Sequence, residues 1–92
     1  MIDPLAALID RFRARTVADR AKLEVFVNGD LNSADLRKLV HNLAGTAGIF
    51  GYGPLGQAAA KIDDQMALGL PADPASLDRL KERLDEVVRS TS

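Results

Sequence analysis

The sequence predicts an all-α fold, an up-down four-helix bundle, and it leaves open an extra helical segment at the N-terminus. Apolar residues recur at steps of three and four along four stretches of the chain, which is the period of a helix. Glycine, proline and other turn residues separate these stretches, and nothing alternates with period two over a useful length. Because the connections are short, neighbouring helices should run antiparallel.

The first stretch begins at Asp3-Pro4, an N-cap residue followed by proline at the first helical position. It ends at the stop signal Asn28-Gly29-Asp30. One long helix would fit, but Thr16 with Asp19 three residues later resembles a capping box, so a break near Thr16 stays open. Its periodic positions are Leu5, Leu8, Ile9, Phe12, Thr16, Leu23, Phe26 and Val27.

Three further stretches follow the same rules. Ser33 can cap the second, which ends at Gly51-Tyr52-Gly53-Pro54; the third ends near Gly69, and Asp73-Pro74 starts the fourth. Residues 89–92 are expected to fray. The inward positions are Leu36, Leu39, Val40, Leu43, Ala47 and Phe50, then Leu55, Ala58, Ala59, Ile62 and Met66, then Leu77, Leu80, Leu84, Val87 and Val88.

The composition narrows the function classes. The 92 residues suit a single domain, 1–92, with 12 basic against 13 acidic side chains and a net charge of -1, so neither nucleic acid nor a membrane surface is an expected partner. No signal peptide and no membrane-spanning run is visible, so the expected location is the cytoplasm. The chain has no cysteine and one histidine, and we therefore expect no metal site.

That single histidine, His41, is the most distinctive chemical group. If the apolar stripe of the second stretch points inward, a rotation of 100° per residue puts His41 about 140° away from it, facing water. Arg37 and Lys38 lie one turn earlier on the same side. Ala44, Gly45 and Gly48 follow on that side, so an imidazole would have cations behind it and almost bare backbone ahead of it.

The glycines near His41 call for an explanation. Glycine inside a helix costs about 1 kcal/mol relative to alanine, so Gly45 and Gly48 together cost roughly 2 kcal/mol. Both point away from the apolar stripe, so clearance beside His41 explains them better than close packing between helices. Five of the seven glycines fall between Gly45 and Gly56, which indicates a specialised local surface.

An exposed histidine is most often an ordinary surface residue, but these neighbours favour chemistry. A Ser–His–Asp triad with Ser33 or Ser76 lacks a nucleophile elbow and an oxyanion loop. A neutral imidazole on an open surface is, however, a competent nucleophile. Nearby cations and an unobstructed approach suit a phosphoryl group, whose transfer depends on positioning and charge stabilisation.

The segment His41-Asn42-Leu43-Ala44-Gly45-Thr46-Ala47-Gly48-Ile49-Phe50-Gly51-Tyr52 resembles the signature of histidine phosphotransfer (HPt) domains. Their pattern is His-x-Leu/Ile-Lys-Gly, then small residues, then an aromatic residue or leucine before glycine. The resemblance implies that His41 receives a phosphoryl group from the aspartate of a response-regulator receiver domain and returns it. It leaves a sensor histidine kinase open as a further partner in the two-component phosphorelay.

The resemblance also assigns roles to other residues. The family commonly places Glu or Gln on the following helix to hydrogen-bond the imidazole, and Asp63 occupies that place, with Asp64 beside it as a residue that could be confused with it. The usual lysine three residues after the histidine is Ala44 here. Either Lys38, Arg37 or Lys61 supplies its charge, or transfer is slower and the choice of partner differs. The surface expected to bind the partner consists of Arg37, Ala44, Gly45, Gly48 and Lys61.

We therefore expect a monomeric phosphoryl carrier without cofactor. No Walker loop or kinase signature is present, so ATP binding is not expected, and any Mg²⁺ would belong to the receiver domain. The main alternative is a non-catalytic helical adaptor that binds a signalling partner through the His41 face. A DNA-binding module has little support because no basic stripe is present.

Overall fold

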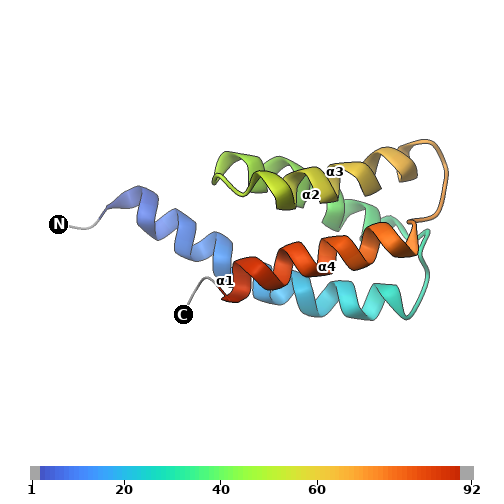
Figure 1. Cartoon of the computed structure of the whole chain (residues 1–92), viewed down its shortest axis with the longest axis horizontal. Helices are drawn as coiled ribbons and strands as arrows, with labels where there is room; N and C mark the ends of the chain where they lie inside the picture. Colours follow the sequence, from blue (N-terminus) through green and yellow to red (C-terminus); the bar gives the residue numbers. More distant parts are fainter. Residues whose placement is uncertain (1–2, 90–92) are drawn as a thin grey trace.

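The computed structural model describes residues 3–89, which form four helices and no strand. The helices are α1 (Pro4–Val27), α2 (Ala34–Ile49), α3 (Gly53–Ala67) and α4 (Pro74–Arg89). Successive helices run in opposite directions, and α2 pairs with α3 while α1 lies beside α4 (Figure 1). The predicted all-α bundle is confirmed.

The predicted helix starts have hydrogen-bonded caps. The side chain of Asp3 accepts a hydrogen bond from the backbone N–H of Leu5 at 3.0 Å, directly before Pro4. Ser33 Oγ accepts from the N–H of Leu36 at 3.1 Å. Each cap satisfies a backbone N–H that has no partner within its own helix.

The fourth helix starts in the same way, and two glycines end the second and third. Asp73 Oδ2 accepts from the backbone N–H of Ser76 at 3.0 Å, before α4 begins at Pro74. Gly51 and Gly69 both have φ of +82°, a left-handed conformation that a side chain disfavours. These glycines let the chain reverse direction after α2 and α3, so that the next helix can pack antiparallel.

The break considered near Thr16 is absent, because α1 is a single helix of 24 residues. Thr16 is fully buried, and its hydroxyl donates a hydrogen bond to the carbonyl of Arg13 at 2.6 Å instead of capping a new helix. Within residues 3–89 there is therefore no separate N-terminal helix; instead, the first turns of α1 extend past the end of α4 (Figure 1). Leu5 and Leu8 on these turns stay exposed although they continue the apolar pattern.

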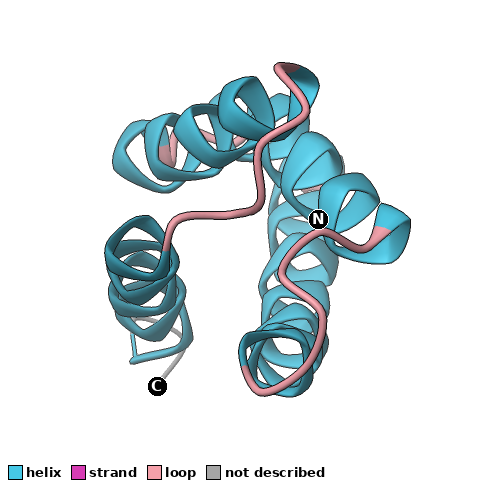
Figure 2. Ribbon diagram, turned by 90° about the vertical axis from the view of Figure 1, so that its right-hand side faces the viewer, coloured by secondary structure: helices cyan, strands magenta, loops and turns pink. Residues whose placement is uncertain are grey.

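Buried apolar side chains from all four helices form one core. The end-on view shows how the four helices are arranged around it (Figure 2). The α2–α3 pair has the most extensive contact, α1–α4 and α3–α4 follow, and α1–α2 has the least. Within residues 3–89, no helix has the length and hydropathy needed to cross a membrane. The fraying expected for residues 90–92 lies outside the described residues, and Arg89 is the last residue of α4.

Candidate functional site

His41 lies on the solvent side of α2, and its side chain is 73% exposed. The opposite side of the same helix carries Leu36, Val40 and Leu43, which are all buried in the core. The direction of His41 therefore follows from the burial of the apolar stripe, because a helix that buries one side must present the other to water.

Asp63 of α3 reaches across to the imidazole. His41 Nδ1 and Asp63 Oδ2 are 3.0 Å apart, and the Asp63 side chain is only 20% exposed. An ionised carboxylate can only accept a hydrogen bond, so we assign the proton to Nδ1. In a neutral imidazole the lone pair is then on Nε2, the ring atom that is free to react. The adjacent Asp64 is exposed to solvent, and the carboxylate that contacts Nδ1 is that of Asp63.

Two of the three cations predicted for the site lie beside the histidine. Arg37 and Lys38 line a shallow hollow with Ala34 and His41, and both cations are exposed. They are one turn before the histidine on α2, so their long side chains can reach a negatively charged group held near the ring.

Lys61 lies elsewhere. It lines a groove between α3 and α4 together with Arg79 and Arg83. Lys61 and Asp63 are two positions apart on α3, which corresponds to a rotation of about 200°, so their side chains leave opposite flanks of the helix. The structure therefore does not bring Lys61 together with His41.

The strip beyond His41 is open. A Cβ atom added at Gly45 or at Gly48 would meet no atom within 4 Å, apart from its own helix backbone and chain neighbours. Both glycines are exposed, Ala44 is half-buried at the edge next to α3, and Ile49 is 78% exposed at the far end. The absence of side chains at the two glycines leaves room for a partner surface to come close to the ring.

The glycine cluster is only partly a surface feature. Gly56 is buried, and a Cβ built on it would lie 3.5 Å from the backbone nitrogen of Gly48 and 3.6 Å from the carbonyl oxygen of Ala44. The expectation that this glycine belongs to a specialised surface is therefore wrong, because Gly56 packs against α2. The clustering of the glycines is evident in the sequence, but only the packing of α3 against α2 shows which of them is buried.

An aromatic stack that the pattern did not reveal holds the turn between α2 and α3. The ring of Phe12 on α1 stacks on Phe50 and Tyr52, with centroid distances of 5.1 and 5.4 Å. The Tyr52 hydroxyl also accepts a hydrogen bond from Arg13 Nε at 2.9 Å. These contacts attach the turn between α2 and α3 to α1.

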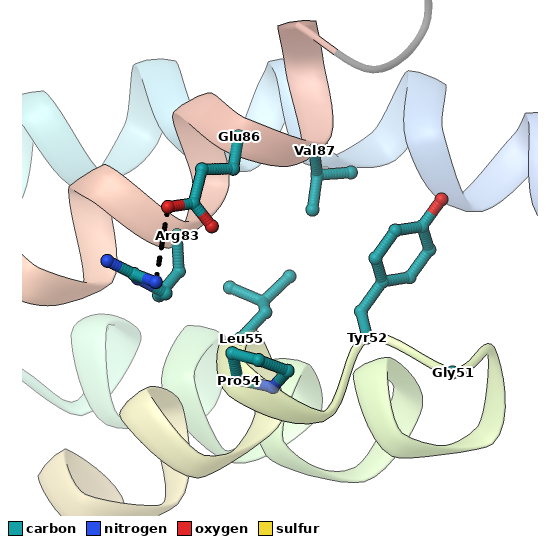
Figure 3. A pocket seen from close by; sticks show the side chains of 7 residues that line it. All are labelled: Gly51, Tyr52, Pro54, Leu55, Arg83, Glu86 and Val87. Carbon is teal, nitrogen blue, oxygen red and sulfur yellow. Dashed lines mark ion pairs between the residues drawn. The ribbon is translucent and has the colours of Figure 1, made fainter.

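A pocket of about 180 Å³ lies between the start of α3 and the end of α4 (Figure 3). Leu55 and Val87 point into it, and an ion pair between Arg83 and Glu86 of 3.1 Å borders it. None of its lining residues is a predicted site residue. The pocket is therefore separate from the surface around His41.

The two serines considered for a Ser–His–Asp triad have other hydrogen-bond partners. Ser33 and Ser76 both take part in hydrogen bonds at helix starts, to Leu36 and Asp73 respectively, and not to His41. In the part of the chain that the structure describes, no group of three or more His, Cys, Asp or Glu side chains could hold a metal ion.

The fold and the site together define a class of protein: a helical bundle that displays one histidine whose Nδ1 is hydrogen-bonded to a carboxylate on the next helix. A comparison with protein-family models matches the Hpt domain over residues 7–90. The chain therefore belongs to the Hpt domain family, the histidine phosphotransfer family. Comparisons with curated proteins and with solved structures gave no significant match.

Proposed function

We propose that this protein relays a phosphoryl group between His41 and the aspartate of response-regulator receiver domains in a two-component phosphorelay. One observation carries the proposal: an imidazole whose side chain is 73% exposed has its Nδ1 engaged by Asp63 at 3.0 Å, which leaves Nε2 as the nitrogen outside that bond. A carrier of this kind works as a monomer in the cytoplasm and needs no cofactor of its own, since the Mg²⁺ is held by the receiver.

The phosphoryl transfer requires no proton transfer. The Nε2 lone pair attacks the phosphorus of the receiver's aspartyl phosphate, so that a nitrogen–phosphorus bond forms while the bond from phosphorus to the carboxylate oxygen breaks. The partner's aspartate leaves as a carboxylate. The ring becomes cationic and keeps its Nδ1 proton, which stays donated to Asp63. The reverse reaction follows the same course.

Charge around the ring supports this chemistry. The carboxylate of Asp63 stabilises the cationic ring that exists while phosphorus is attached to Nε2. On the other side, Lys38 and Arg37 lie close to the hollow beside His41 and can neutralise the phosphoryl oxygens. These two residues would supply the charge that a lysine in place of Ala44 commonly provides. Lys61, on the other flank of α3, has no part in this proposal.

The test is incubation with phosphorylated receiver domains, followed by intact mass measurement. We expect one added phosphoryl group that is lost in acid and stable in base, and we expect none on His41→Gln. Because His41 is the only histidine in the sequence, an acid-labile label that is absent from His41→Gln can be assigned to it. Equal labelling of His41→Gln would show that the site assignment is wrong.

The same experiment separates the carrier from the adaptor. The exposed Ile49 lies next to the open glycine strip, and an exposed apolar side chain favours contact with a partner protein. This face could therefore bind a partner without any phosphoryl transfer. If the receiver binds the wild-type protein but never labels it, the adaptor function is correct and the relay is not.

A further inference from the structure

The hydrogen bond to His41 depends on how closely α3 lies to α2. Asp63 has a short side chain, with one methylene between its Cα atom and its carboxylate, yet its Oδ2 lies 3.0 Å from the ring nitrogen. A bond of this length is at the usual optimum, and it would be lost if the helices were about 1 Å further apart. Something in the helix interface must therefore set that separation.

At Gly56 the backbone of α3 lies close to the backbone of α2. A Cβ built there would be 3.5 Å from the backbone nitrogen of Gly48, 3.6 Å from the carbonyl oxygen of Ala44 and 3.6 Å from the Cβ of Ala47. These are ordinary contact distances, so a single methyl group fits. Any atom beyond Cβ that points at α2 would meet backbone, which cannot move aside as a flexible side chain can.

Gly56 and Asp63 belong to the same side of the same interface. They are seven residues apart on α3, two turns of helix and about 10 Å along the axis, so they share one face. On α2, Ala44 is one turn from His41 and Gly48 is two turns away. The close approach at Gly56 and the hydrogen bond at Asp63 thus lie along one seam between the two helices.

We propose that Gly56 is a positioning residue that allows α3 to approach α2 closely enough for the short Asp63 side chain to reach His41. The missing side chain and the short carboxylate form a matched pair. A larger residue at Gly56 moves α3 outward and breaks the bond, and a longer carboxylate at position 63 spans the wider gap and restores it. The effect of Gly56 on phosphotransfer rests on the proposed function, whereas its effect on the tautomer of the His41 ring does not.

The direct test is nitrogen NMR of the His41 ring in the isolated protein, which is unambiguous because the chain has no other histidine. We expect wild-type protein to show one dominant neutral form, protonated at Nδ1. Gly56→Ala is the matched control and should keep this signature, since its Cβ makes only ordinary contacts. Gly56→Val should shift the population towards the form protonated at Nε2.

Rescue separates positioning from general damage. Adding Asp63→Glu to Gly56→Val should restore the Nδ1 signature, and phosphorylation by a receiver should fall about tenfold in Gly56→Val and recover in the double variant. A merely structural role for Gly56 predicts no recovery. If Gly56→Val does not fold by circular dichroism, Gly56→Ser, with one atom beyond Cβ, takes its place and should give a smaller shift in the same direction.

The outcomes distinguish the two proposals. If folded Gly56→Val or Gly56→Ser keeps the wild-type ring signature, or if Asp63→Glu fails to restore it, the positioning role is wrong even when His41 is phosphorylated. If wild-type protein is never labelled, the relay is wrong while the dependence of the ring on Gly56 still stands.

Discussion

At the scale of single residues, the chemistry of His41 depends on which of two neighbouring carboxylates it meets. Asp63 and Asp64 are adjacent in the sequence and easily confused, but on a helix they point about 100° apart. The structure brings Asp63 to 3.0 Å from the ring and leaves Asp64 exposed. The proposed roles of Nδ1 as a fixed donor and Nε2 as a nucleophile follow from that one contact.

A second carboxylate, Asp19 on α1, makes stability depend on pH. Its side chain is only 5% exposed, and this burial raises the pKa of Asp19, while Arg15 at 3.8 Å and Lys22 lower it by less. Because the pKa is higher in the folded than in the unfolded protein, the cost of burying the charge is absent below the unfolded pKa. This cost grows as the pH rises from the unfolded pKa through the folded pKa of Asp19, so the stability of the protein falls over that pH range.

We therefore expect Asp19→Asn to raise the free energy of unfolding at pH 7, because the amide keeps the shape and removes the buried charge. Near pH 3 both proteins are uncharged at this position and should be equally stable. Urea denaturation at several pH values measures the difference. A gain of the same size at pH 3 and pH 7 would show that the ionisation of Asp19 is not the cause.

At the scale of elements, α2 has two different tasks on its two sides. One side buries Leu36, Val40 and Leu43, and the other presents His41 above glycines that weaken the helix. Glycine is a poor helix former, so this arrangement reduces stability in favour of an open surface. The conflict between propensity and function is itself a sign of a binding surface.

Substitutions at Gly48 separate the two tasks. Because nothing lies within 4 Å of a Cβ there, Gly48→Ala should stabilise the fold by about 0.5–1 kcal/mol, and Gly48→Leu should stabilise it similarly. Gly48→Leu should nevertheless slow phosphorylation by a receiver about tenfold or more, since its side chain occupies the approach to His41. Thermal unfolding and labelling rates measured side by side test this. Unchanged labelling of a folded Gly48→Leu protein would mean that the partner does not approach over Gly48.

At the scale of the whole molecule, the α2–α3 pair carries the site and the α1–α4 pair supports it. Arg20 of α1 pairs with Asp85 of α4 at 2.9 Å, and Lys81 of α4 pairs with Glu24 of α1 at 3.4 Å. Such partly exposed pairs contribute little each, typically about 0–1 kcal/mol. Most of the cohesion must come from the shared apolar core.

Leu84 tests this division of tasks. It is fully buried on α4, and Leu84→Ala should lower the free energy of unfolding by about 2–5 kcal/mol through lost burial and a cavity. At a temperature where the variant is still folded, its labelling by a receiver should match wild type, because Leu84 does not contact the His41 surface. Calorimetry and labelling at low temperature provide the comparison, and a large loss of labelling in folded protein would show that α4 influences the site.

The sequence by itself determined the four helices, the caps of α1, α2 and α4, and the outward direction of His41, because periodicity, capping and turn chemistry are local properties of the chain. Only the tertiary structure decided that α1 passes unbroken through Thr16, that Lys61 faces α4, that Gly56 is buried, and that Asp63 meets the ring. Each of these depends on the distance and rotation of one helix relative to another, which no single helical pattern contains.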